Sequence, residues 1–177
     1  MNQESKVTNE AVAKERAKQE ATACKVKQEG IRLYCPVKGD VASITKAPDH
    51  AFADKQLGEG VVINPLGHTI YSPCDGEVSF IFSTNHAIVI KEDSGLSVMI
   101  HIGKDTIHLE KNIFTLCVTE GQQVKKGDKL LEFDLLYLKK YGKSAAIPMV
   151  VQNLESKQLT IVKMGMSNEK ELIMEIR

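Results

Sequence analysis

Closely spaced β-type segments, separated by turn residues, constrain the fold of this chain more than any other feature of its sequence. After residue 30, short runs rich in Val, Ile and Leu are broken every few residues by Gly, Pro, Asp or Asn. The clearest runs cover residues 61–63, 78–82, 87–90, 96–102, 114–118 and 129–133. Many short strands with turn signals between them are typical of an antiparallel β-sandwich or barrel. One short helix is expected at residues 134–141, ending near Gly142.

A strand-and-turn pattern occurs twice in the first half of the predicted domain. Residues 34–41 (YCPVKGDV) recur as residues 71–78 (YSPCDGEV), with Tyr, Pro, Gly, an acidic residue and Val in the same order. Two copies are too few for a solenoid, but they fit two related halves of one sandwich. A third turn-rich segment, residues 120–130, resembles a segment of barrel-sandwich folds that include biotin and lipoyl carriers.

The first 30 residues differ in composition from the rest of the chain. They are rich in Lys, Glu, Gln and Ala and almost lack bulky apolar side chains. Their propensity permits a helix, but a helix without an apolar stripe is only marginally stable in water. We therefore expect a charged extension or linker at residues 1–30 and one folded domain at residues 31–177.

Charge, hydropathy and cysteine usage exclude several classes of protein. Lys plus Arg (23) balance Asp plus Glu (23), so no basic field favours nucleic acid or an anionic membrane. The sequence has neither an apolar membrane span nor the apolar core of a secretion signal. The four cysteines are scattered and form no Cys-x-x-Cys pair. These features predict a cytoplasmic protein with free thiols, no nucleic-acid partner and no direct membrane insertion.

Two histidines, His86 and His101, lie in one predicted β-hairpin with its turn at residues 92–95. If the loop has two or four residues, Lys91 pairs with Leu96 and the two histidines lie directly opposite each other. Directly opposed residues have Cβ atoms about 4.5–5.5 Å apart on one face of the sheet. In this register the two imidazoles would touch.

A three-residue loop with Gly95 in the left-handed conformation is an equally good interpretation of the same turn. It slips the pairing by one residue and places the histidines on opposite faces. Apolar residues line one face in either register, so the pattern alone leaves both open.

Adjacent imidazoles suit the chemistry of phosphoryl transfer. A neutral imidazole has one nucleophilic nitrogen when its other nitrogen donates a hydrogen bond, and histidine is an accepted covalent carrier. A second imidazole can donate to phosphoryl oxygens and offset charge in the transition state. The sequence has no glycine-rich phosphate loop, so a nucleotide is not the expected donor.

Several motifs closely resemble the glucose-type IIA component of the bacterial phosphoenolpyruvate-dependent sugar phosphotransferase system. They are Pro48-Asp49, FADK at 52–55, LGEG at 57–60, PCDG at 73–76, TNHA at 84–87, HIGKDT at 101–106, EGQ at 120–122 with Gly127-Asp128, and EFDL at 132–135. The resemblance covers nearly all of residues 31–177. It implies an all-β antiparallel sandwich of the barrel-sandwich (duplicated hybrid motif) type with one or two short helices. It also favours the register with adjacent histidines.

The resemblance implies a phosphotransferase with a phosphohistidine intermediate that serves sugar uptake. Such a protein receives phosphate from the histidine phosphocarrier protein HPr and passes it to the cysteine of a IIB domain. By position, His101 corresponds to the phosphorylated residue, attacking through Nε2 while the main chain near Gly103 holds Nδ1–H. His86 corresponds to the second imidazole, and Thr84 to the residue that orients it.

The same resemblance implies which residues meet the partner proteins. Asp49 and Asp105 occupy positions that meet a basic residue of the partner. Phe52, Phe82 and Met99 occupy the apolar contact ring. No cofactor is required, although in some regulatory complexes of the family the two histidines share a zinc ion with a partner's carboxylate. Two protein ligands alone make a weak zinc site.

One residue of the HIGKDT motif departs from the family pattern. Lys104 stands where members of the family usually have an aliphatic residue, and it adds positive charge beside the predicted phosphoryl site. We expect it to affect either the phosphorylated state or the choice of partner.

Three other functions fit parts of the sequence. A zinc endopeptidase on a related sandwich needs a third ligand and usually a His-x-His pair, but Gly103 follows two residues after His101. A biotin or lipoyl carrier needs a lysine at an exposed hairpin tip, typically between methionines, and no such tip is found. A regulator whose phosphorylation state is sensed by target proteins is compatible with every motif above.

Overall fold

The computed structural model describes residues 30–109 and 112–177, and Arg32–Ile176 form one compact unit. The predicted extension at residues 1–30 lies outside the described residues, except for Gly30. The strands are β1 (Ile31–Tyr34), β2 (Gly39–Ser43), β3 (Glu59–Pro65), β4 (Thr69–Tyr71), β5 (Gly76–Ile81), β6 (Ala87–Glu92), β7 (Ser97–His101), β8 (Phe114–Leu116), β9 (Gln123–Val124), β10 (Lys129–Phe133), β11 (Ile147–Val151), β12 (Leu159–Ile161), β13 (Gly165–Ser167) and β14 (Leu172–Ile176).

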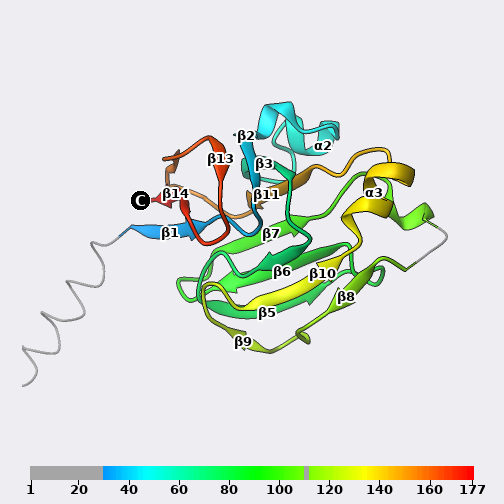
Figure 1. Cartoon of the computed structure of the whole chain (residues 1–177). Helices are drawn as coiled ribbons and strands as arrows, with labels where there is room; N and C mark the ends of the chain where they lie inside the picture. The colour runs from blue at the N-terminus through cyan, green and yellow to red at the C-terminus, as the bar shows by residue number, and fades with distance from the viewer. Residues whose placement is uncertain (1–29, 110–111) are drawn as a thin grey trace, which may run out of the picture. The chain divides into compact units, whose positions relative to one another are not determined.

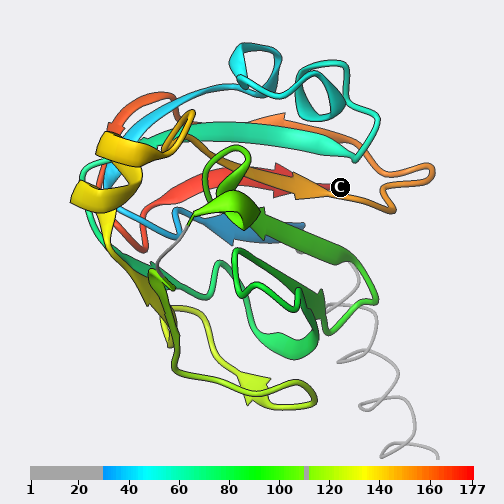
Figure 2. The same ribbon diagram turned by 90° about the vertical axis from the view of Figure 1, so that its right-hand side faces the viewer.

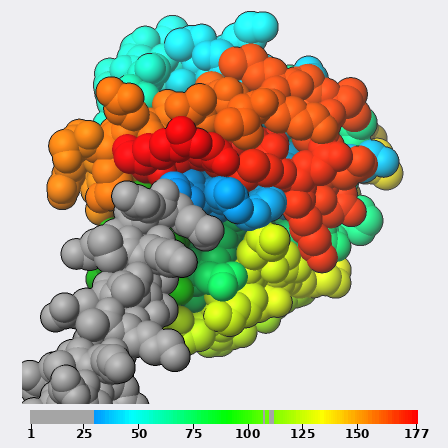
Figure 3. All heavy atoms as spheres, turned by 90° about the vertical axis from the view of Figure 1, so that its left-hand side faces the viewer, coloured from blue at the N-terminus to red at the C-terminus, as the bar shows by residue number. Residues whose placement is uncertain are grey.

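These strands form three sheets, stacked in layers as Figures 1 and 2 show. The largest has the order β13-β2-β3-β11-β7-β6-β5-β9, and all of its neighbouring strands are antiparallel. The smaller sheets have the orders β4-β10-β8 and β1-β14-β12. On the face drawn in Figure 3, the red C-terminal strand β14 lies beside the blue strand β1. The predicted all-β antiparallel sandwich is confirmed.

Two short α-helices stand outside the strand layers of the described chain (Figure 1). Helix α3 (Leu135–Tyr141) begins at Asp134, whose carboxylate accepts from the Tyr137 amide, and it ends at Gly142, as the sequence predicts. Helix α2 (His50–Ala53) is a single turn capped by the Asp49 carboxylate. Two 3-10 turns, η1 (Ile44–Lys46) and η2 (Thr106–His108), complete the helical structure.

The repeated strand-and-turn pattern produces two turns that hydrogen-bond to each other. The Tyr34 amide donates to the Pro73 carbonyl at 2.9 Å, and the Tyr71 amide donates to the Pro36 carbonyl at 2.8 Å. Each bond joins equivalent positions of the two copies in opposite directions. The two predicted halves are therefore related by a local twofold arrangement.

Side chains repeat this exchange around the same two turns. Lys126 lies 4.1 Å from the centre of the Tyr34 ring, and Lys170 lies 4.7 Å from the centre of the Tyr71 ring. The Lys126 amide also donates to Asp75 beside the second turn, while the Lys170 amide donates to the Cys35 carbonyl in the first turn. The backbone of each lysine thus hydrogen-bonds to the turn of one half, while its side chain covers the tyrosine of the other half.

A buried apolar cluster supports the outer face of the large sheet near helix α2. We call it the floor cluster; it consists of Ile44, Phe52, Val62, Val89, Met99, Ala146 and Val150. The opposite face of β6 and β7 is also buried, and Ile88, Ile90 and Ile100 are at most 1% exposed. Because both faces of these strands are covered, they read in the sequence as continuous apolar runs.

The register between β6 and β7 differs from the one that the sequence analysis favoured. Lys91 pairs with Ser97 rather than Leu96, and Ala87 rather than His86 lies opposite His101. The Glu92 amide donates to the Leu96 carbonyl at 2.8 Å, so the loop beyond this pair has three residues and ends at Gly95, whose φ is +96°. The prediction of direct cross-strand opposition is therefore wrong, because a left-handed glycine closes a loop of three residues rather than two or four.

Candidate functional site

The imidazoles of His86 and His101 nevertheless contact each other. Their ring centres are 4.8 Å apart, and the rings are nearly perpendicular, at 81°. His101 is the last residue of β7 and shares the face of Val89 and Met99. His86 lies before the start of β6 and follows Asn85, whose φ is +59°. Because it is outside the regular strand, the alternation of side chains along β6 does not determine to which face the His86 side chain points. The predicted adjacency is confirmed, although the backbone that produces it is different.

The turn before β6 fixes the orientation of the His86 ring. The Asn85 amide donates to the Phe82 carbonyl at 2.7 Å, and the Phe82 amide donates to the Ala87 carbonyl at 3.0 Å. Within this turn, the Thr84 hydroxyl is hydrogen-bonded to Nδ1 of His86. His86 is 9% exposed, and Nε2 is the ring nitrogen that Thr84 does not bind.

His101 lies between two rings and a tight turn. Its ring centre is 5.2 Å from that of Phe52 in helix α2. Its Nδ1 is enclosed and has no hydrogen-bond partner. The Gly103 main chain acts to raise the pKa of the ring. Gly103 has a φ of +73°, and its amide donates to the Ala146 carbonyl at 3.0 Å. Of the two ring nitrogens of His101, Nδ1 is thus the enclosed one.

Burial keeps both imidazoles neutral near pH 7. Burial first, and then the neighbouring His86, lower the pKa of His101 to about 4, although the Gly103 main chain and Asp49 act in the opposite direction. Burial also lowers the pKa of His86. A neutral imidazole retains one nitrogen lone pair, so each ring can act as a nucleophile or as a single hydrogen-bond donor.

Comparison with known proteins agrees with this geometry. Residues 31–157 match the family model of the phosphoenolpyruvate-dependent sugar phosphotransferase system, EIIA 1. The chain belongs to this family. Among solved structures, it is similar to the glucose permease IIA from Mycoplasma capricolum, with a TM-score of 0.79 and 33% sequence identity. That match covers 84% of this chain and 96% of the other, so this EIIA chain is a component of a sugar phosphotransferase system.

Aromatic rings continue from the histidine pair along strand β5. The Phe82 ring centre is 5.5 Å from that of His86, and the Phe80 ring centre is 5.0 Å from that of Phe82. Phe82 is partly exposed and Phe80 is 49% exposed, whereas Phe52 and Met99 are buried, at 2% and 7%. Of these four side chains, only Phe82 and Phe80 thus reach the surface of this EIIA domain. Sequence reasoning missed Phe80, and a second Phe two positions before Phe82 on one strand face was the available signal.

The two predicted acidic residues belong to the turns beside the histidine pair. The Asp49 carboxylate caps helix α2 by accepting from the Ala51 amide at 3.0 Å. Asp105 has a φ of +55°, and its carboxylate forms an ion pair with Lys143 at 2.6 Å. Hydrogen bonding from Lys143 lowers the pKa of Asp105, so this carboxylate is ionised at neutral pH.

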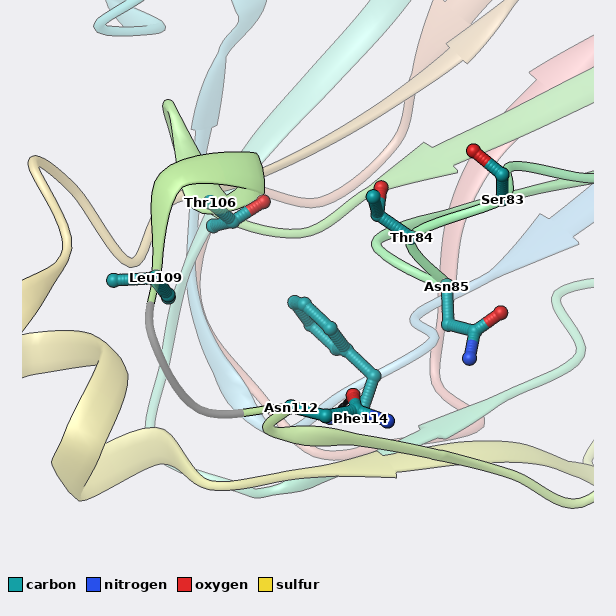
Figure 4. Close-up of a pocket in the computed structure, with 7 residues that line it drawn as sticks. All are labelled: Ser83, Thr84, Asn85, Thr106, Leu109, Asn112 and Phe114. Carbon is teal, nitrogen blue, oxygen red and sulfur yellow. Dashed lines mark hydrogen bonds between the residues drawn. The ribbon is translucent and has the colours of Figure 1, made fainter.

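A hollow of about 220 Å³ lies next to the turn that holds Thr84. Figure 4 shows residues 83–85 on one side of it, Thr106 and Leu109 on another, and the Phe114 ring between them. Neither imidazole lines this hollow. The hollow is therefore separate from the histidine pair.

Metal-binding clusters and buried thiols can be assessed over the described part of the chain. Residues 30–109 and 112–177 contain no group of three or more His, Cys, Asp or Glu side chains that could hold a metal ion. Burial raises the pKa of Cys35 to about 11 and that of Cys74 to about 12, so these thiols are unreactive. Within the same residues, no helix is long and apolar enough to cross a membrane.

Proposed function

We propose that this EIIA chain is a cytoplasmic phosphocarrier whose His101 accepts a phosphoryl group from phospho-HPr and passes it to the cysteine of a IIB domain during sugar uptake. The observation that carries the proposal is the contact between two neutral imidazoles whose ring centres are 4.8 Å apart, with Nδ1 bound by Thr84 in His86 and enclosed in His101. One ring is the nucleophile and the other is the donor that stabilises the transferred group.

The first step forms a bond from phosphorus to Nε2 of His101. The lone pair of this nitrogen attacks, the bond from phosphorus to the donor's imidazole breaks, and the electron pair of that bond returns to the donor. The proton on Nδ1 of His101 stays in place beside the Gly103 main chain, so no base is needed. Transfer of this kind depends mainly on positioning and on stabilising charge at the phosphoryl oxygens.

His86 supplies that stabilisation. When the Thr84 hydroxyl donates to Nδ1 of His86, the ring proton lies on Nε2, which then donates to a phosphoryl oxygen. In the second step, the thiolate of the IIB domain attacks phosphorus, and the bond to Nε2 of His101 breaks. The electron pair returns to His101, which regains its neutral form.

The surface around the histidine pair suits partners with a basic rim and an apolar centre. Asp49 and Asp105 offer carboxylates to basic residues of HPr or the IIB domain, and Phe82 offers an apolar contact. Phe52 and Met99 are buried, so their role is to support the imidazoles rather than to contact the partner. Regulatory target proteins would meet the same surface and sense whether it carries a phosphoryl dianion.

Zinc is proposed only for such regulatory complexes. The chain supplies His86 and His101, and a partner's carboxylate would have to complete the site. No cofactor is proposed for transfer between HPr, this chain and the IIB domain, because the steps above balance without one.

Reconstituted transfer tests the proposal. The chain is incubated with phosphoenolpyruvate, enzyme I and HPr, and any acid-labile phosphate is mapped. We expect phosphate on His101, no acceptance by His101→Ala, and acceptance but poor onward transfer by His86→Ala. His68→Ala, which changes an exposed histidine outside the site, is the matched control and should behave as wild type. Full acceptance and onward transfer by His101→Ala would refute the assignment.

A further inference from the structure

Lys104 connects the segment that bears His101 to the segment that bears Phe52. Its ammonium donates to the Pro48 carbonyl at 2.9 Å, although the two residues are 56 positions apart. Pro48 immediately precedes Asp49, the N-cap of helix α2. Lys104 itself is three residues after His101, in the turn that encloses Nδ1. The side chain therefore spans the two parts of the chain that meet at the His101 ring.

The backbone of Lys104 is anchored independently of its side chain. Its amide donates to the Ser144 carbonyl at 3.0 Å, and the preceding Gly103 amide donates to the Ala146 carbonyl at the same distance. Position 104 is thus fixed on the segment that leads into β11 (Ile147–Val151). Because the backbone at position 104 is fixed, the Lys104 side chain can hold in place a segment that is less stable by itself.

Helix α2 is such a weak element. It has only four residues, and a helix of one turn does not persist without tertiary contacts. Its contacts include the Asp49 cap at its start and the buried Phe52 ring, which lies in the floor cluster and against His101. The Pro48 carbonyl that Lys104 binds lies directly before the Asp49 cap. The hydrogen bond therefore restrains the backbone at the start of helix α2.

We propose that Lys104 is a positioning residue that ties the N-terminus of helix α2 to the His101 turn and so holds Phe52 and Asp49 against the reactive imidazole. Its charge is of secondary importance for the imidazole, because the charged side chain that shifts the pKa of His101 is Asp49 and not Lys104. The consequence for transfer rests on the proposed function, whereas the packing role does not.

Two measurements without phosphate test the packing role. In Lys104→Met, which keeps the aliphatic stem but cannot donate, we expect the amides of Ala53 and Asp54 to exchange about three- to tenfold faster with solvent. We also expect the pKa of His101, measured by NMR titration of the imidazole, to rise toward its ordinary value. Burial is the main cause of the low value, and a looser Phe52 admits water.

Matched variants separate the hydrogen bond from the charge. Lys104→Arg keeps the donor and the charge, and Lys104→Gln keeps an amide donor without the charge. Both should restore slow exchange and the low pKa. Lys46→Met removes a charge from an exposed residue of the neighbouring turn η1 and should change neither measurement. Wild-type exchange and titration in Lys104→Met, or equal changes in Lys46→Met, would overturn the proposal.

Kinetics with phospho-HPr extend the test to function. Because a looser helix α2 must be ordered on docking, Lys104→Met should raise KM about three- to tenfold and change kcat less than about twofold. A fall in kcat with unchanged KM would show that Lys104 acts on the phosphoryl charge, and would overturn the positioning role. If wild-type protein accepts no phosphate, the proposed function fails while the exchange and titration results still decide the role of Lys104.

Discussion

At the scale of single residues, each imidazole of the pair has a different neighbour at Nδ1. His86 has the Thr84 hydroxyl there, while Nδ1 of His101 is enclosed beside the Gly103 main chain. In the proposed mechanism, these neighbours place the ring proton on different nitrogens of the two histidines. His86 carries its proton on Nε2, and His101 carries its proton on Nδ1. The difference makes one ring a donor and the other a nucleophile.

Substitution of Thr84 tests this assignment. Thr84→Val keeps the shape of the side chain but leaves Nδ1 of His86 without its partner, so the Nε2–H form is no longer selected. We expect onward transfer to the IIB domain to slow about tenfold, while acceptance from phospho-HPr changes little. Thr84→Ser retains the hydroxyl and serves as the control. Wild-type onward transfer by Thr84→Val would mean that the hydrogen bond does not orient the donor.

Which side chains come together at the candidate site was largely predictable, but their surroundings were not. The TNHA and HIGKDT motifs contain both histidines, Thr84 and Asp105, because these side chains are adjacent in sequence to the turns that orient them. The hydrogen bond of Lys104 to Pro48 joins residues far apart in sequence, and no local pattern indicates it. The exposure of Phe80 depends likewise on which neighbours cover a strand face.

At the scale of elements, two glycines determine where the β6–β7 hairpin places His101. Gly95 closes the three-residue loop at a φ of +96°, in open space. Gly103 follows the strand at a φ of +73°, where an added Cβ would lie 2.7 Å from the Thr106 methyl group and 2.9 Å from the Ser144 carbonyl oxygen. Gly95 is required only for its left-handed backbone conformation. Gly103 is required both for its conformation and because no room is left for a Cβ atom.

Alanine at these glycines should therefore have unequal effects. Gly95→Ala is expected to lower the free energy of unfolding by about 1 kcal/mol, the cost of a left-handed alanine, and to leave transfer unchanged. Gly103→Ala adds steric overlap and should cost roughly 2–4 kcal/mol and slow phosphorylation of His101. Urea denaturation followed by the phosphorylation assay measures both. Equal losses in the two variants would contradict the packing described at Gly103.

The strands themselves were predictable from turn signals, whereas their register was not. Ala87 to Ile90 are apolar at every position, so both registers of β6 on β7 bury a complete face. The choice of register depended on the backbone conformation of Gly95. A glycine at this position is compatible with a loop of two, three or four residues, so the sequence alone did not determine the loop length. Helix α2 was not located in the sequence, because four residues are too few to show a helical period.

At the scale of the whole molecule, the buried histidine pair links folding stability to pH. The pKa of His101 is about 4 in the folded protein, against an ordinary value of 6.5. Between these values the unfolded chain binds the additional proton, so stability is fully present above about pH 6.5 and is lost as the pH falls toward 4. His86 adds to the loss in the same direction.

Chemical denaturation at several pH values measures this linkage. We expect the free energy of unfolding to fall by about 2 kcal/mol between about pH 7 and pH 5, with a smaller fall in His101→Gln. The carboxylates with lowered pKa values, such as Glu132 and Glu171, titrate below this window and do not account for the change. An equal fall in wild type and in His101→Gln would assign the linkage to other groups.

The hydrogen bonds between the Tyr34 and Tyr71 turns have a consequence for how such a chain could arise. Each turn has a donor that only the other turn's carbonyl accepts, and each tyrosine ring is covered by a lysine of the other half. A shorter polypeptide with a single copy would leave these groups without partners unless a second molecule supplied them. The present domain is thus equivalent to a symmetric dimer joined into one polypeptide, and neither half can be expected to fold after separation.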